Sequence, residues 1–275
     1  MKEDIRQAPI GVFDSGVGGL TVAREIMRQI PKERIVYFGD TARVPYGNKS
    51  KETITRFSEQ IARFLLSHNV KTIVVACNTA SAYALDTLEK ELDVPIIGVV
   101  RPGAKMALAK TRNGKVGVIG TEATIGSGIY DAYIREVRTD AVIYGKACPL
   151  FVPLVEEGLW EDPVTEEIAR RYLSELIDLD IDTLILGCTH YPLIRSVIGK
   201  IMGEDVTLIN PAYETAIELK QMLKERDLLN DVEPALGSNP YQFYVSDGAE
   251  KFKQFANSIM KYGVLSTKTI HIEDY

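Results

Sequence analysis

The sequence contains little of what stabilises small secreted proteins or builds metal centres. Its 275 residues include three cysteines, at positions 77, 148 and 188, together with three histidines and one tryptophan. An odd number of cysteines without a CxxC spacing fits neither a disulfide framework nor a cysteine-based metal site. We therefore expect no bound metal. The cysteine content is that of a protein from a reducing compartment.

Long apolar runs and an excess of positive charge are also missing. No stretch approaches the roughly 18 uninterrupted apolar residues of a membrane helix, and the opening MKEDIRQAP lacks the apolar core of a secretory signal. The 32 Lys and Arg against 38 Asp and Glu give a net charge of -6, whereas non-specific nucleic-acid binding needs a positive field. We expect a cytoplasmic protein that binds neither membrane nor nucleic acid.

What the sequence does contain is a regular alternation of short apolar strands and amphipathic helical patterns. Near-continuous apolar strands that alternate with helices predict a doubly wound α/β fold with parallel sheets covered on both faces. The strands are expected at 10–14, 34–38, 72–77, 95–100, 115–120, 141–145, 183–188, 206–210 and 241–246. The main helices are expected at 21–30, 51–67, 81–92, 127–137, 164–178, 213–226 and 248–262.

Two pairs of segments repeat at nearly equal offsets. IGVFDSGVGG at 10–19 resembles VGVIGTEATI at 116–125, and TIVVACNTA at 72–80 resembles TLILGCTHY at 183–191. A fixed offset between similar segments indicates a duplicated unit. We therefore predict two similar α/β domains related by pseudo-two-fold symmetry, with the active site in the cleft between them.

The limits of the two domains follow from where the pattern restarts. It begins again after Pro102, and the last strand and helix exceed what a second unit needs. We place the first domain at 1–101 plus 211–275, with the chain crossing back at Asn210-Pro211, and the second domain at 102–210.

Cys77 and Cys188 occupy equivalent places in the repeat. Each lies just past the carboxyl end of a strand, where open α/β sheets bind ligands, and each precedes an expected helix whose N-terminus would lower a thiol pKa. One buried cysteine is usually a small packing residue, and this is our interpretation of Cys148, which lacks the repeat. Two cysteines in matched contexts, one from each side of a cleft, favour chemistry instead.

A pair of thiols that face one ligand suits inversion at a carbon atom. Such a reaction needs a base on one face of the carbon and an acid on the other. The α-proton of an amino acid is very weakly acidic, so the site must stabilise a carbanion by oriented dipoles and excluded water. Small donors at strand ends, namely Ser15, Asn78, Thr79, Thr121 and Thr189, meet that requirement.

Other candidate residues each have a simpler alternative. The glycine loop after Asp14 brings backbone N–H groups close to an anion, or it is a tight turn. Asp40 is a helix cap or a simple turn former, and Tyr46-Gly47 is an anion contact or a surface turn. His190 carries a proton beside Cys188 or is a polar loop residue, and Glu156 is most simply a solvated helix edge.

Taken together, six runs of this sequence resemble the glutamate racemases. They are DSGVGGL at 14–20, GDTARVPYG at 39–47, ACNTAS at 76–81, GVIGTEAT at 117–124, CPLFVPLVE at 148–156 and GCTHYPL at 187–193. The resemblance covers about 10–210, and the paired CNTA and CTHYP elements also occur in looser form in aspartate and hydantoin racemases. The PYG and DSGVGG runs favour glutamate.

The resemblance implies a role for each matched residue. Cys77 would deprotonate D-glutamate and Cys188 would deprotonate L-glutamate, with Asp14 and His190 assisting them and also contacting the substrate. Asp40 and Glu156 would have supporting roles. The residues implied to hold the amino acid's polar groups are Ser15, Tyr46, Gly47, Asn78, Thr79, Thr121 and Thr189. The resemblance further implies a homodimer without pyridoxal phosphate or metal that supplies D-glutamate for peptidoglycan.

Two alternatives remain open from the residues alone. One is a racemase of the same superfamily that acts on aspartate or hydantoins. The other is a two-domain solute-binding or regulatory protein whose thiols are inert.

Overall fold

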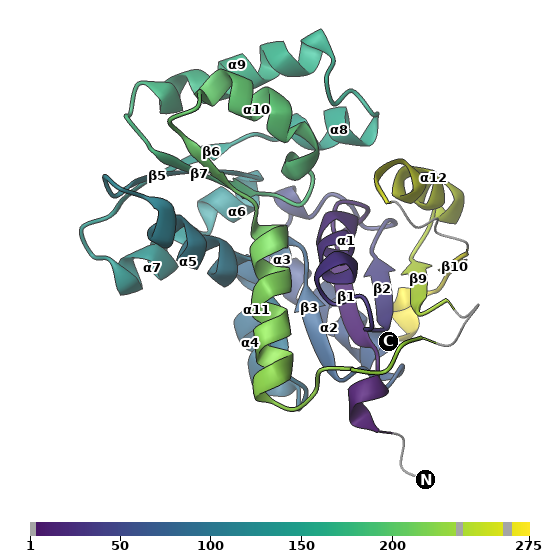
Figure 1. Ribbon diagram of the computed structural model, residues 1–275. Coiled ribbons are helices and arrows are strands. Elements are labelled where there is room, and N and C mark those ends of the chain that lie inside the picture. Colours follow the sequence, from purple (N-terminus) through teal and green to yellow (C-terminus); the bar gives the residue numbers. More distant parts are fainter. Residues whose placement is uncertain (1–3, 235–238, 261–265) are drawn as a thin grey trace.

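The protein is built on two parallel β-sheets, which lie one above the other in Figure 1. The computed structural model describes residues 4–234, 239–260 and 266–275. In strand order, the first sheet contains β10 (Thr267–Thr269), β9 (Tyr241–Val245), β2 (Ile35–Gly39), β1 (Ile10–Asp14), β3 (Thr72–Val75) and β4 (Ile96–Gly98). The second contains β6 (Val142–Ala147), β5 (Lys115–Gly120), β7 (Thr183–Gly187) and β8 (Thr207–Ile209). Every pairing in both sheets is parallel.

The predicted duplication is visible in the order of the strands. The order β2-β1-β3-β4 in the first sheet has its counterpart in β6-β5-β7-β8 in the second. β1 therefore corresponds to β5, and β3, which precedes Cys77, corresponds to β7, which precedes Cys188. The strands at the centre are fully buried, as expected for parallel sheets with helices on both faces.

Helices cover both faces of each sheet. Around the first sheet, α1 (Leu20–Gln29), α11 (Pro211–Glu225) and α12 (Ala249–Ile259) enclose one core, and α2 (Lys51–Leu66), α3 (Asn78–Tyr83) and α4 (Leu85–Glu91) enclose the other. Around the second sheet, α5 (Val100–Lys110) and α7 (Ile129–Val137) pack on one face, and α8 (Phe151–Glu156), α9 (Pro163–Ile177) and α10 (Arg195–Met202) on the other. The remaining elements are α6 (Glu122–Gly126) and the short helices η1 (Ile5–Gln7), η2 (Tyr46–Asn48), η3 (Tyr191–Ile194) and η4 (Ile272–Asp274).

Several element boundaries differ from the sequence expectation. The expected helix at 81–92 is two helices, α3 and α4, which meet at Ala84. The helix expected near 127–137 is α7, which Gly128 separates from α6 by adopting a left-handed conformation with φ of 65°. The end of the helix expected at 248–262 falls on residues 261 and 262, outside the described part of the chain.

The strand expected before the first crossing ends earlier than predicted. The strand expected at 95–100 ends at Gly98, and α5 begins at Val100 and continues through Pro102. Proline is tolerated in a first helical turn because its missing N–H has no partner there. α5 belongs to the core of the second sheet, and α11 returns along the first (Figure 1). The domain limits themselves remain a prediction.

Within the described residues, no helix combines the length and apolar character that crossing a bilayer requires.

A buried ion pair fixes the start of β3 to two distant segments. The Nζ atom of Lys71 donates to Glu33 Oε2 at 2.5 Å and to the carbonyl oxygen of Leu228 at 2.9 Å. The side chains of Lys71 and Glu33 are 0% and 1% exposed, and Glu33 Oε1 accepts from the backbone N–H of Asn230 at 2.9 Å. The pair holds the N-terminal end of the strand that leads to Cys77.

Replacing Lys71 by Met is expected to lower the free energy of unfolding by about 3–5 kcal/mol, because it leaves a buried carboxylate without its partner. Equilibrium urea unfolding measures this change. The double variant with Lys71→Met and Glu33→Gln keeps the acceptor for Asn230 without a buried charge, so it should recover most of the loss. A double variant no more stable than the single one would contradict the explanation.

Candidate functional site

One cavity lies at the carboxyl ends of both sheets and has a volume of about 460 Å³. Both Cys77 and Cys188 line it, each arriving from the equivalent strand of its own half. Of the other residues predicted from the sequence, Ser15, Tyr46, Gly47, Asn78, Thr79, Thr121, Glu156, Thr189 and His190 also line it. Asp14 and Asp40 lie behind the wall and act on it through neighbours.

Cys77 is held as a buried thiol at the start of α3. Its Sγ accepts from the backbone N–H of Ala80 at 3.4 Å, so this cysteine is itself the N-cap of the helix, and the thiol donates to Ser15 Oγ at 3.7 Å. The sequence led us to expect a lowered pKa from the helix N-terminus. Instead, burial, together with the carboxylate of Asp14, raises the pKa of Cys77 to about 12. Cys77 is therefore a protonated thiol at neutral pH.

Cys188 has a cationic partner that Cys77 lacks. Its Sγ lies 3.7 Å from Nδ1 of His190, and Nε2 of His190 lies 3.0 Å from Oε1 of Glu156. Burial opposes the charged imidazole, but the hydrogen bonds to Cys188 and Glu156 outweigh it and raise the pKa of His190 to about 10. His190 is thus an imidazolium that donates to both neighbours. Glu156 is therefore a hydrogen-bond partner of this histidine and not a solvated residue at a helix edge.

The helix expected directly after Cys188 is a short 3-10 helix, η3, which starts at Tyr191 and has no side-chain cap. Thr189 therefore does not cap a helix. Its hydroxyl donates to Oδ1 of Asp14 at 3.5 Å, across the junction between the two halves. The positive group beside Cys188 is His190, two residues away. The sequence had instead predicted a helix N-terminus at this place.

Asp14 is fully buried at the end of β1. Its Oδ2 accepts from the backbone N–H of Gly16 at 2.9 Å. Burial raises the pKa of Asp14, while the positive charge of His190 and the backbone N–H groups of the glycine loop oppose the rise. The carboxylate thereby fixes the glycine loop and contacts Thr189 from the other half.

Asp40 holds Tyr46 in the cavity wall. Its Oδ2 accepts from the Tyr46 hydroxyl at 2.5 Å and from Nε of Arg43 at 2.7 Å, and its Oδ1 accepts from Ser246 Oγ at 2.9 Å. Both the burial of Tyr46 and the neighbouring Asp40 raise the pKa of its phenol well above 10. Tyr46 therefore stays neutral and fixes the turn that presents Gly47 to the cavity.

Hydroxyl and amide groups next to this turn also join the two halves. Thr79 Oγ1 lies 3.0 Å from Thr121 Oγ1 and 3.2 Å from Thr124 Oγ1. The Tyr130 hydroxyl donates to Oδ1 of Asn78 at 2.7 Å. Sequence reasoning missed Thr124 and Tyr130, because they lie inside helices with no local signal, and only the packing of the two units brings them to the site.

The lining residues contain no lysine and no arginine, and every one of them lies in the described part of the chain. An anionic ligand would therefore be held by backbone N–H groups, by hydroxyl and amide side chains, and by the imidazolium of His190.

Comparison with known proteins shows which family has this arrangement. Residues 10–218 match the family model of the Asp/Glu/hydantoin racemases. The chain belongs to this family. Curated relatives of this racemase include the glutamate racemase of Geobacter metallireducens, which is 49% identical over 91% of this chain and 92% of its own. The glutamate racemase of Neisseria meningitidis is 49% identical over 90% and 91%.

Solved structures show the same fold. The glutamate racemase isoform RacE1 of Bacillus anthracis superposes on this racemase with a TM-score of 0.92 at 43% identity, covering 96% of this chain and 98% of its own. The glutamate racemase of Francisella tularensis in complex with D-glutamate has a TM-score of 0.90 at 40% identity, with 98% and 100% covered. The prediction of two α/β units is thereby confirmed at the level of fold.

Gly18 marks the closest approach of the two halves in this racemase. A Cβ atom there would lie 2.3 Å from Thr189 Oγ1 and 2.5 Å from His190 Nδ1. We expect Gly18→Ala to displace the histidine from Cys188 and to lower kcat/KM for racemisation by about tenfold or more, since 1.4 kcal/mol of lost transition-state stabilisation corresponds to tenfold. The matched control is Gly126→Ala, where nothing lies within 4 Å. Equal activity of the two variants would contradict the prediction.

The Glu156–His190 contact predicts a specific pH dependence. The pKa of His190 is raised above its unfolded value of 6.5, so the stability it contributes is complete below that pH and is lost as the pH rises through about 10. Glu156→Gln removes one cause of the rise and should lower this pKa. NMR titration of the His190 ring measures it, with His68, remote from the cavity, as an internal control. An unchanged His190 titration would refute the assignment.

Proposed function

We propose that this protein interconverts L-glutamate and D-glutamate by a two-base mechanism. The single observation that supports the proposal most strongly is that Cys77 and Cys188, from equivalent strands of the two halves, line one cavity. The names of the relatives supply the substrate, and the D-glutamate in the Francisella tularensis structure agrees with it.

The two thiols are proposed to start in different protonation states. For L-glutamate, the Cys188 thiolate beside the imidazolium of His190 removes the α-proton, and the thiol of Cys77 delivers its own proton to the opposite face of the carbon. The electron pair of the broken C–H bond becomes that of the new one. Release of D-glutamate leaves Cys77 as thiolate and Cys188 as thiol, which is the state that acts on D-glutamate.

The remaining site residues are proposed to hold the substrate and its carbanion. Hydroxyl, amide and backbone donors fixed within a buried wall need no reorganisation as charge develops. These are Ser15, Tyr46, Gly47, Asn78, Thr79, Thr121 and Thr189. Asp14, behind the wall, is proposed to assist them through the glycine loop and Thr189. Asp40 and Glu156 support Tyr46 and His190. The reaction is proposed to need no cofactor and to supply D-glutamate for peptidoglycan synthesis.

A homodimer and a cytoplasmic location remain predictions.

The test of the proposed function is the optical activity of L-glutamate incubated with metal-free protein. We expect the circular dichroism signal to decay to zero, because the equilibrium mixture is racemic. L-Aspartate and a hydantoin in parallel samples test the alternative substrates. A constant signal with L-glutamate would overturn the proposal, and faster decay with L-aspartate would change the substrate.

Cys77→Ser and Cys188→Ser should each reduce net racemisation by at least about a thousandfold, because one face of the carbon loses its proton carrier. The control is Cys148→Ala, since Cys148 is buried between the second sheet and helices α8, α9 and α10 and does not line the cavity. The same circular dichroism assay reads all three variants. Retained racemisation in either serine variant would contradict the two-thiol mechanism.

A further inference from the structure

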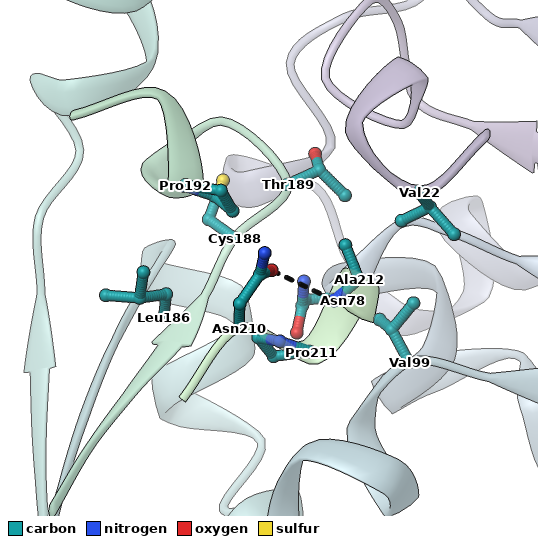
Figure 2. Close-up of a pocket in the computed structure, with 10 residues that line it drawn as sticks. All are labelled: Val22, Asn78, Val99, Leu186, Cys188, Thr189, Pro192, Asn210, Pro211 and Ala212. Carbon is teal, nitrogen blue, oxygen red and sulfur yellow. Dashed lines mark hydrogen bonds between the residues drawn. The ribbon is translucent and has the colours of Figure 1, made fainter. Parts of the chain in front are cut away.

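A second, much smaller cavity lies beside Cys188 (Figure 2). Its volume of about 10 Å³ corresponds to the space that one water molecule needs. Cys188, Thr189 and Asn78 line both this cavity and the large one, so they form the wall between the two. Asn210, the last residue before the chain crosses back to the first unit, closes the small cavity on its other side.

The two amide side chains at this cavity have fixed orientations. Oδ1 of Asn78 accepts from the Tyr130 hydroxyl at 2.7 Å, and Oδ1 of Asn210 accepts from the backbone N–H of Ala212 at 3.1 Å, which caps α11. With each oxygen engaged, the NH₂ groups are the ends left for the cavity. Figure 2 shows the nitrogen of Asn210 directed away from Pro211 and toward Cys188.

The chemistry of this small cavity is that of an internal water site. A purely apolar cavity of this size stays dry, whereas a buried water molecule needs two to four polar partners. Asn78, Asn210, Thr189 and Cys188 supply polar groups around the cavity, and Val22 and Val99 close it on the apolar side.

We propose that this cavity binds one water molecule and that Asn210, through this water, is a positioning residue for the Cys188 thiolate. The amide NH₂ of Asn210 donates to the water oxygen, which turns a water proton toward the sulfur atom. A hydrogen bond to a charged group stabilises that charge. The consequence for racemisation rests on the proposed function. The effect on the thiol does not.

Other groups that act on Cys188 must stay unchanged for the test to be specific. His190 contacts the sulfur directly, and Glu156 acts through His190. The further titratable groups that interact with it electrostatically are Cys77, Tyr130, Cys148 and Tyr191, and Asp14 contacts the adjoining Thr189.

The decisive variant is Asn210→Asp, which retains an oxygen to cap α11 but loses the donor. Iodoacetamide alkylation of each cysteine is followed against pH by mass spectrometry of the peptides, without substrate. We expect Cys188 to react about tenfold more slowly below its midpoint, and Cys77 to react at the wild-type rate. Asn210→Ser, which retains a cap without adding charge, should slow Cys188 in the same direction.

A matched control separates this effect from that of helix capping. Asp162 caps α9 before Pro163, as Asn210 caps α11 before Pro211, and it lines neither cavity. Asp162→Asn should leave both rates unchanged. Equal slowing of Cys77 and Cys188 in the Asn210 variants, or no slowing of Cys188, would overturn the proposal. So would a high-resolution crystal structure with a dry cavity, whereas a failed glutamate assay would overturn only the proposed function.

Discussion

The site depends on the contact between the glycine loop that follows β1 and the turn that follows β7. Thr21 Oγ1 donates to the carbonyl oxygen of Thr189 at 2.9 Å, and Gly18 leaves just enough space for Thr189 and His190. This contact joins the two halves of the molecule at the point where both thiols meet the cavity. Any side chain at Gly18 would separate them, so the chemistry rests on a glycine that itself carries no reactive group.

The two thiols are equivalent in the repeat but not in their surroundings. Cys77 is a helix cap in an apolar setting beside a carboxylate, so its pKa is raised to about 12. Cys188 has an imidazolium beside it, held by Glu156. A duplicated fold thus provides a symmetric pair of positions, while different neighbours place a buried carboxylate near one thiol and a charged imidazole beside the other.

Much of the architecture was predictable because it depends on local pattern. Apolar strands that alternate with helices predicted parallel sheets, and the repeated segments around Cys77 and Cys188 predicted a duplicated unit, which the strand orders confirm. The boundaries expected for the helix at 81–92 and the strand at 95–100 were wrong. The cap at Ala84 and the proline in the first turn of α5, which begins at Val100, each act over only one or two residues. The direction of the Cys77 pKa was wrong as well, because burial depends on packing that sequence does not display.

The sequence by itself determined the two thiols, their matched places and the family they resemble, since these follow from residue identity and spacing. Only the tertiary structure decided that Glu156 holds His190, that Asp40 holds Tyr46, and that Thr124 and Tyr130 contact the lining residues Thr79 and Asn78. The contacts of Thr124 and Tyr130 are set by how the two packed units meet, and those of Asp40 and Glu156 by packing within one unit. No local periodicity records either kind of packing.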